Sequence, residues 1–378
     1  MKKNKAYRFR LMPNKTQTNL IDRTIGCTRF VYNHMLADKI RHYKDTKLSL
    51  KNTPAHYKNE FEFLKEVDSL ALANAQMNLE TAYSNFFRRV KQGKKEVGFP
   101  KFKSKKKCSW SYTTNNQKDS IRIENNKIKL PKIGFVKLIQ HREIPSDYII
   151  KSVTITKTRT NKYYISVLVE YETQVVKKEI EKVIGLDFSM KELYIDSNGY
   201  SANFPRFFRL AQKKLAKEQR ILSRRKHGSK RYEKQRLKVA KIHEHTASQR
   251  KDFLHKESYK LANEYDMVCI EDLNMQAMSQ CLNFGKSIAD NGWGMFRTFL
   301  NYKLEDQGKQ LFVIDKWFPS SKMCNVCGSI NKELTLSDRE WNCDCGAGHN
   351  RDHNAGINIR NFGIRTVGMT GIAQECCN

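Results

Sequence analysis

Four cysteines near the C-terminus constrain the fold of this chain more than any other feature. Two residues separate Cys324 from Cys327, and one residue separates Cys343 from Cys345. The two pairs are 15 residues apart in the sequence. Each close pair can present two thiolates on one turn, and two such turns complete the tetrahedral four-sulfur shell of a structural zinc ribbon. We therefore expect one bound Zn²⁺, with His349 as a conceivable substitute ligand. The alternative is four reduced cysteines without a metal.

The other cysteines carry less information. Four of them are scattered, and we expect them to serve buried packing: Cys27, Cys108, Cys269 and Cys281. The pair Cys376 and Cys377 indicates nothing definite. The start MKKNKAYRFRLMP has no apolar signal core, and no stretch approaches the roughly 20 apolar residues of a membrane span. We expect a soluble, cytoplasmic protein without a membrane partner, associated with the nucleoid when it binds DNA.

The charge of the chain indicates its partners. The 378 residues hold 70 Lys plus Arg against 39 Asp plus Glu, a net charge of +31 that excludes most ordinary metabolic enzymes. Such an excess attracts polyanions by releasing their counterions, and nucleic acid is the commonest intracellular polyanion. The alternative is a merely solvated basic surface. With 39% hydrophobic residues, the chain can still build cores, and its length predicts two or three domains.

Hydrophobic periodicity divides the chain in two. The first half shows a strand near 5–13, helical patterns from Thr16 and from about Asp68, and a period of two from about residue 110. This predicts a small antiparallel β-domain with a helical insertion. The second half alternates apolar strands with helices, which predicts an α/β domain. There, Gly228 and Ser229 are expected to end one long helix and cap the next.

Three acids stand at distinctive places in this second half. Asp187 ends an apolar strand in GLDFS, Glu271 ends another in VCIEDLN, and Asp352 begins an apolar helix in NRDHNAGINI. Carboxylates gathered at one edge of a sheet can hold two divalent ions, Mg²⁺ or Mn²⁺, for an in-line attack on phosphate. Any one of these acids alone would most often be a helix cap or a surface ion pair.

Two basic segments are candidates for nucleic-acid contact. Residues 206–251 contain 17 Lys plus Arg and three acids, which favours a helical hairpin that grips a phosphate backbone rather than a solvated helix face. Its candidate contacts are Arg224, Arg225, Lys230 and Arg231. The aromatic and basic mixture around Lys101 and Lys103 indicates a weaker RNA clamp.

Taken together, these segments resemble the TnpB family, the RNA-guided nucleases encoded by insertion sequences and related to ancestors of type V CRISPR effectors. The resemblance covers nearly the whole chain, and its motifs are GCTRFVYN, EVDSLALANAQMNLETAYSNFF, GFPKFKSKK, GLDFSM, RKDFLHK, IEDLNM, SIADNGWGMF, FPSSKMCNVCG and REWNCDCGAGHNRDHNAGINI. Two departures are Ser189, where many relatives have Gly, and the shorter second cysteine pair. Neither removes a ligand.

The resemblance implies an α+β multidomain fold. It assigns a wedge-like antiparallel β-barrel to 1–10 and 96–180, a helical recognition domain to 11–95, a RuvC-like, RNase H-type nuclease domain to 181–319 and 350–378, and the zinc ribbon, as a target nucleic-acid-binding module, to 320–349. Asp187, Glu271 and Asp352 match the family's three RuvC carboxylates.

It also implies an RNA-guided, magnesium-dependent DNA endonuclease. One chain would bind one guide RNA from the transposon end and cleave double-stranded target DNA beside a short motif, while base pairing supplies specificity. The helix from Asp68 and a loop at Thr113–Asn116 would contact that motif, with Ser69, Asn74, Thr114 and Asn115 as candidates. The alternatives are a cleavage-inactive RNA-guided repressor, an RNase H-like transposase, and a zinc-ribbon RNA-binding protein without catalysis.

Overall fold

The computed structural model describes residues 2–93, 96–106, 108–281, 285–335 and 337–368. The chain forms two compact units, Met1–Gln174 and Val175–Asn378. Among the described helices, none has the length and apolar character needed to cross a membrane.

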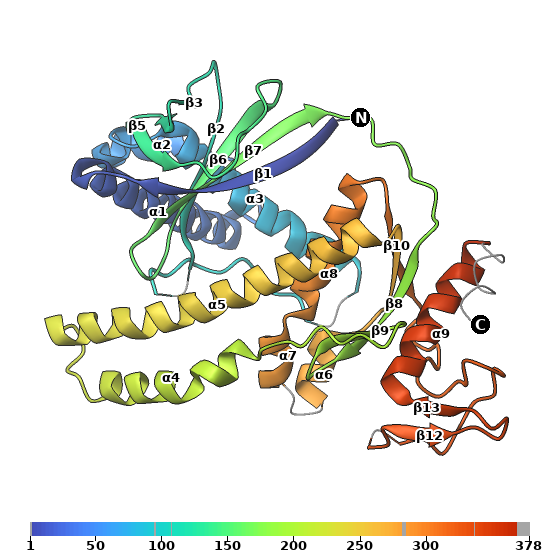
Figure 1. Ribbon diagram of the computed structural model, residues 1–378. Helices are drawn as coiled ribbons and strands as arrows, with labels where there is room; N and C mark the ends of the chain where they lie inside the picture. Colours follow the sequence, from blue (N-terminus) through green and yellow to red (C-terminus); the bar gives the residue numbers. More distant parts are fainter. Residues whose placement is uncertain (1, 94–95, 107, 282–284, 336, 369–378) are drawn as a thin grey trace. The chain divides into compact units, whose positions relative to one another are not determined.

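A seven-stranded antiparallel sheet forms the centre of the first unit (Figure 1). Its strands are β1 (Lys2–Met12), β2 (Trp110–Asn115), β3 (Arg122–Glu124), β4 (Lys127–Leu130), β5 (Gly134–Ile139), β6 (Ile149–Lys157) and β7 (Tyr163–Glu172). They lie in the order β2-β6-β7-β1-β5-β4-β3. The first strand of the chain therefore lies in the middle of the sheet, between β7 and β5.

The sheet is curled around one apolar core, to which all its strands except β3 contribute fully buried side chains. It differs from the expected barrel, because β2 and β3 are edge strands and no pairing joins them within the described residues. Instead, the side chain of Asn116 links the two edges: its amide donates to the Ile150 carbonyl at 3.1 Å and accepts from the Ile121 N–H at 2.9 Å. The loop predicted at Thr113–Asn116 is also different, since β2 continues through Asn115.

The helices of this unit are α1 (Lys15–Thr46), α2 (Pro54–Glu60), a 3₁₀ turn (Glu62–Lys65) and α3 (Ser69–Lys91). Asn14 and Gln17 form a capping box at the start of α1, and Asp68 caps α3. Leu72, Ala75 and Leu79 recur on the buried face of α3 and pack against α1 in a second apolar core. The predicted helix from Asp68 is thus confirmed.

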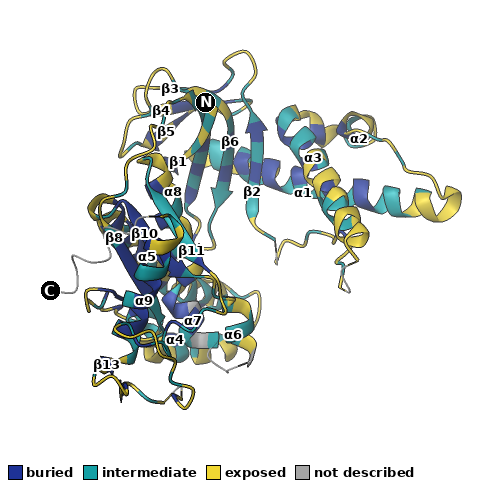
Figure 2. Cartoon of the chain, turned by 90° about the vertical axis from the view of Figure 1, so that its right-hand side faces the viewer, coloured by how far each residue is buried: buried dark blue, intermediate teal, exposed yellow. Residues whose placement is uncertain are grey.

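In the second unit, a four-stranded sheet has the order β11-β10-β8-β9. These strands are β8 (Val183–Ser189), β9 (Leu193–Asp196), β10 (Met267–Glu271) and β11 (Gln310–Ile314). The central strands are buried over most of β10 and over Ile184–Leu186 of β8 (Figure 2), which explains their near-continuous apolar runs. β10 runs parallel to both β8 and β11, so the carboxyl ends of three strands share one edge.

The helices of the second unit are α4 (Phe207–Ser223), α5 (Lys230–Glu264), α6 (Met275–Cys281), α7 (Gly285–Asn291), α8 (Trp293–Asp306) and α9 (Arg351–Thr366). Helices α4 and α5 form the predicted hairpin, and the Ser229 hydroxyl caps α5 by accepting from the Tyr232 N–H. The prediction that Gly228 ends the first helix is wrong, because α4 already ends at Ser223 and Gly228, with φ +80°, lies in the connecting turn. Between β11 and α9 lies a small two-stranded sheet, β12 (Glu340–Asn342) and β13 (Gly348–Asn350).

Glycines bring α9 unusually close to the four-stranded sheet. A Cβ added to Gly185 of β8 would overlap the carbonyl oxygen of Gly356, and one added to Gly363 would overlap the Cys269 sulfur. No other residue type allows this approach. Because α9 begins at Arg351, the close packing also fixes where Asp352 lies.

Candidate active site and metal centre

The four cysteines Cys324, Cys327, Cys343 and Cys345, which lie before and between the strands of the small sheet, converge on one point. Their sulfur atoms all lie within 4.8 Å of one another. Cys324 Sγ lies 3.8 Å from Cys345 Sγ, and Cys327 Sγ lies 3.5 Å from Cys343 Sγ. These separations fit four thiolates around one Zn²⁺ at about 2.3 Å each. The one-residue-shorter second pair therefore does not prevent a four-sulfur shell.

Two neighbouring side chains support this shell. The Ser329 hydroxyl lies 3.0 Å from Cys327 Sγ and 3.1 Å from Cys343 Sγ. Its hydrogen bond lowers the pKa of Cys327 to about 6, and the pKa of Cys343 is also lowered, by the Cys345 N–H and by Ser329. His349 is buried beside Cys324, with its Nε2 3.1 Å from the sulfur, so it is placed as a partner of a cysteine ligand.

The strand register brings Asp187 and Glu271 together. Leu186 of β8 pairs with Ile270 of β10, so the two acids occupy the next position on adjacent parallel strands. Adjacent strands lie about 4.8 Å apart, and residues in register point to the same face. The predicted strand end at Glu271 is confirmed, whereas β8 continues two residues beyond Asp187 to Ser189, because it pairs with β9.

Asp187 experiences the charges of the other two acids. Burial raises the pKa of Asp187 well above its ordinary value, and the carboxylates of Glu271 and Asp352 raise it further. Burial also raises the pKa of Glu271, against a hydrogen bond from the Ser320 hydroxyl that lowers it. Asp187 thus lies close enough to both other carboxylates for their charges to disfavour its ionised form.

Asp352 is neutralised by two arginines. Its Oδ2 accepts from Arg339 at 2.9 Å, and its Oδ1 accepts from Arg351 at 3.1 Å. Arg339 directly precedes β12, and the Arg351 N–H donates to the Arg339 carbonyl at 2.8 Å. The segment that carries the cysteines is therefore bonded to the third acid through both side chain and backbone.

The cysteine site and the site of the three acids differ in the distances between their ligand atoms. Across the residues that the structure describes, the cysteine quartet is the one set of three or more metal-binding side chains with all ligand atoms within 4.8 Å. The three acids share an edge without this spacing, and both oxygens of Asp352 are bound to arginine. The raised pKa of Asp187 beside two carboxylates and the two arginines on Asp352 both indicate that positive charge is favourable here, which fits divalent cations.

The residues predicted to contact a DNA motif are only partly accessible. Asn74, Lys103 and Thr113 line one hollow of about 460 Å³ between α1, α3 and β2. Thr114 is buried at 1% exposure, with its hydroxyl unbonded, so in this structure it faces the core of the sheet. Asn115 is half-buried.

Ser69 and the two lysines proposed for the RNA clamp, Lys101 and Lys103, differ in their exposure and contacts. The Ser69 hydroxyl accepts from Lys58 Nζ at 2.7 Å. Lys101 is exposed, while the ammonium of Lys103 lies 3.9 Å from the centre of the Tyr32 ring, and burial lowers the pKa of Lys103. Asn33 holds the Lys103 backbone through two hydrogen bonds of 2.8 and 3.0 Å.

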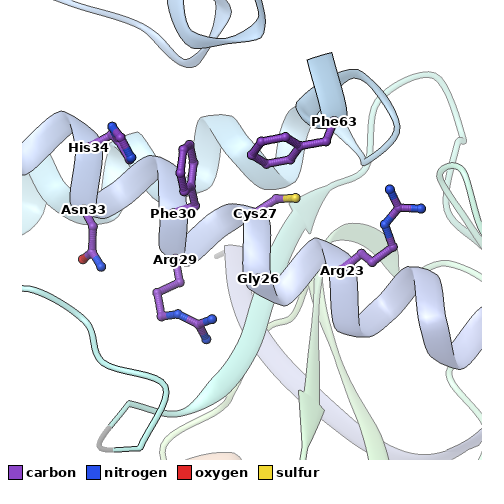
Figure 3. Close-up of a pocket in the computed structure, with 8 residues that line it drawn as sticks. All are labelled: Arg23, Gly26, Cys27, Arg29, Phe30, Asn33, His34 and Phe63. Carbon is purple, nitrogen blue, oxygen red and sulfur yellow. The ribbon is translucent and has the colours of Figure 1, made fainter. Parts of the chain in front are cut away.

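The GCTRFVYN segment forms part of a second hollow, of about 570 Å³, on α1. Figure 3 shows Arg29 and Asn33 projecting from one side of the helix, and Phe30 and His34 from the other, with Phe63 opposite Phe30. A Cβ at Gly26 would meet nothing within 4 Å, so the backbone is open there. Arg29 lines both hollows, and the sequence interpretation did not single it out.

The tip of the α4–α5 hairpin matches the predicted basic surface. Arg224, Arg225, Lys230 and Arg231 are all exposed there. Among the described residues, none of these four side chains has a hydrogen-bond or ion-pair partner that would neutralise its charge. Four unneutralised cations at a helix junction suit a phosphate backbone.

Sequence reasoning missed the side chains that support the acids: Ser320, Arg339 and Arg351. Ser320 lies in FPSSKMCNVCG, and the arginines lie in REWNCDCGAGHNRDHNAGINI. The sequence feature that could have identified these three residues is their position inside the family motifs. Their partners are 49 residues away for Ser320 and 13 for Arg339, so spacing could not identify them.

Three family descriptions match parts of the chain. "Probable transposase" (OrfB_IS605) matches residues 166–282, "Cas12f1-like, TNB domain" matches 293–359, and "Helix-turn-helix domain" (HTH_OrfB_IS605) matches 1–47. The first match contains Asp187 and Glu271, and the second contains Asp352 and the cysteines.

Similar proteins extend over almost the whole chain. A Streptomyces pristinaespiralis protein named "Putative RNA-guided DNA endonuclease" is 35% identical, covering 95% of this chain and 89% of its own. The Escherichia coli K12 protein "Putative RNA-guided DNA endonuclease InsQ" is 31% identical, covering 100% and 94%.

A solved structure shares the fold. It is described as "Cryo-EM structure of the Cas12f1-sgRNA-target DNA complex", with a TM-score of 0.57, 15% identity, and coverage of 92% of this chain and 83% of that chain.

Proposed function

The chain belongs to the TnpB family, on the evidence of a 35% identical relative that it matches almost end to end, and we propose that it is an RNA-guided DNA endonuclease. The observation that carries the proposal is the group of Asp187, Glu271 and Asp352. Asp187 is buried beside two further carboxylates, which is unfavourable for its charged form, and such strongly perturbed acids are typical of functional sites.

These three acids are proposed to bind two Mg²⁺ or Mn²⁺ ions. When bound, such ions activate water and stabilise the attacking and leaving oxygens of phosphodiester hydrolysis. Other residues of the chain hold these three carboxylates in place. Ser320 orients the Glu271 carboxylate through its hydrogen bond, and the glycine contacts between β8 and α9 hold Asp352 near Asp187. The cysteine quartet is proposed to bind one structural Zn²⁺.

The partners follow from charge and from the solved relative. That relative is a complex with sgRNA and target DNA. We propose that this chain binds one guide RNA, derived from the transposon end, mainly through its basic N-terminal half, since residues 1–180 hold 38 Lys plus Arg against 16 acids. Base pairing would then select double-stranded DNA, and the protein would read only a short adjacent motif.

The domain boundaries remain part of the proposal. The division into a wedge-like domain, a helical insertion at 11–95, a RuvC-like nuclease domain and a ribbon at 320–349 agrees with the order of the sheets and helices. The hollow beside Asn74 and Thr113 is then the candidate surface for the adjacent DNA motif.

The test begins with RNA that co-purifies with the full-length protein. Sequencing this RNA gives the guide, and a plasmid library with the matching target beside randomised flanks then tests cleavage in Mg²⁺. We expect cutting beside one flanking motif. Asp187→Asn, Glu271→Gln and Asp352→Asn should each abolish cutting and leave RNA binding unchanged, since each removes a charge that holds a cation and not a phosphate contact.

The outcomes separate the alternatives. Target binding without cleavage in the wild type would indicate an RNA-guided repressor. Strand joining in place of hydrolysis would indicate a transposase. Wild-type cutting by any of the three variants would refute the assigned site.

A further inference from the structure

Trp317 is the most exposed large aromatic side chain that the structure describes, at 80% exposure. It lies in the loop after β11, which ends at Ile314. Within the same range, the three other tryptophans are buried or half-buried. A side chain that stays in water buries no apolar surface and so does not stabilise the fold. Packing in the core therefore does not explain a tryptophan at this position.

Both ends of the loop that carries Trp317 are attached to Glu271. On one side, Ile314 pairs in register with Glu271 across the β10–β11 ladder. On the other, the Ser320 hydroxyl bonds to the Glu271 carboxylate. Trp317 lies midway between these anchors, so it is at the rim of the edge where the three acids meet.

The loop itself is ordered at this position. The Trp317 N–H donates to the Asp315 carboxylate at 2.7 Å, which forms a tight turn. Lys316 places its ammonium 4.6 Å from the centre of the indole ring. An exposed aromatic face therefore lies beside a cation, next to a candidate phosphodiester-cleaving site.

An exposed aromatic face beside a cation suits one class of ligand, a nucleic-acid strand with unpaired bases. Nucleic-acid strands without a paired partner expose the faces of their bases, and these stack on aromatic side chains while cations contact the adjacent phosphates. A base inside a duplex has no free face for an indole. Strand spacing places the end of β11 about 10 Å from that of β8, two strands away, which is within reach of nucleotides next to the bond being cut.

We propose that Trp317 stacks on an unpaired base of the DNA strand that enters the acid edge, with Lys316 contacting its phosphate. Trp317 thereby positions the strand for cleavage and favours single-stranded over duplex DNA at the site. The inference rests on the proposed nuclease function and names a substrate contact for that same site.

The test replaces target bases one at a time by 2-aminopurine, whose fluorescence falls when it stacks on an indole. The target is bound to the guide-loaded Asp187→Asn protein, so that no cleavage interferes. We expect quenching beyond that in free DNA at one or two adjacent positions beside the cut site. Trp317→Ala should remove it, and Trp317→Phe should retain part of it.

Tyr200→Ala provides the matched control. Tyr200 is 40% exposed and has Lys260 4.0 Å from its ring centre, so it repeats the aromatic and lysine pair. It follows β9 beside Asp196, which pairs with Leu186, so it lies at the β9 edge of the sheet, on the opposite side from β11 and the loop of Trp317. This variant should leave the quenching unchanged.

A second measurement is single-turnover cleavage at saturating target in the otherwise wild-type protein. Trp317→Ala should slow cutting about tenfold without changing guide-RNA affinity, and Trp317→Phe should restore most of the rate. Unchanged quenching and an unchanged rate in Trp317→Ala would overturn the proposal. If the wild type does not cleave at all, the nuclease function fails, while the fluorescence result still decides whether Trp317 stacks on DNA.

Discussion

Gly185 of β8 lies directly against Gly356 of α9. A Cβ at position 185 would overlap the Gly356 carbonyl oxygen and lie 2.6 Å from the backbone nitrogen of Arg360. Gly185 precedes Asp187 by two residues, and Gly356 follows Asp352 by one helical turn. The contact therefore sets the separation of two of the candidate catalytic acids.

Gly185→Ala should destabilise the second unit by about 1–3 kcal/mol, because the methyl group must displace helix backbone and not a flexible side chain. Cleavage should fall with it, since α9 carries Asp352. Urea unfolding measures the first effect. Gly294→Ala is the control: its Cβ meets nothing within 4 Å, so a better helix former should leave stability unchanged or raise it. Equal stability of the two variants would show that the close contact is unimportant.

Asp187→Asn should raise the melting temperature by a few degrees in the absence of divalent cations. The reason is that burial and the charges of Glu271 and Asp352 make the ionised carboxyl unfavourable in the folded protein. Added Mg²⁺ should raise the melting temperature of the wild type and have little effect on the variant. Differential scanning fluorimetry with and without Mg²⁺ measures both. A variant that melts below the wild type without metal would contradict the proposed repulsion.

Zinc should couple to cleavage through Asp352. Protein purified without added zinc should contain about one Zn²⁺ per chain, which elemental analysis can determine. Cys324→Ser with Cys327→Ser should lose this zinc and loosen Arg339, whose carbonyl and side chain bind Arg351 and Asp352. Single-turnover cutting at saturating DNA should then fall far more than guide-RNA binding. If the ribbon only holds DNA, saturating target will restore the normal rate.

Asp266 should stabilise the fold in a pH-dependent way. Burial alone would raise its pKa, but hydrogen bonds from Lys178 at 2.7 Å and from the Lys182 and Glu181 N–H groups outweigh burial and lower it. A lowered folded pKa means that the stabilisation is complete above the ordinary value of 3.8 and is lost as the pH falls through the folded pKa below it.

The corresponding variant is Asp266→Asn. It should unfold about 1–3 kcal/mol more easily than the wild type at pH 7, and the difference should shrink below pH 3.8. Urea unfolding across this range measures it. Asp252→Asn, which breaks the exposed pair with Lys256, should have almost no effect at either pH. A constant difference from pH 7 to acid would exclude the ionised carboxyl as the cause.

Local features of the fold were predictable from the sequence. The helix after Asp68, the Ser229 cap of α5 and the strand ending at Glu271 each depend on residues within a few positions of one another. The same holds for the two cysteine pairs, whose short spacings already place two thiolates on one turn. The positions of Asp187, Glu271 and Asp352 at two strand ends and a helix start already indicated a shared metal site, and the family motifs matched them to the three RuvC carboxylates.

Tertiary structure alone decided how these parts meet. The bonds of Arg339 to Asp352 and of Ser320 to Glu271, and the place of Trp317 at the rim, depend on strand register and on how α9 packs. The open edge between β2 and β3 and the burial of Thr114 likewise depend on pairing across the sheet. Periodicity records which face of an element is apolar, whereas contacts between distant segments arise only when close packing selects one arrangement of those faces.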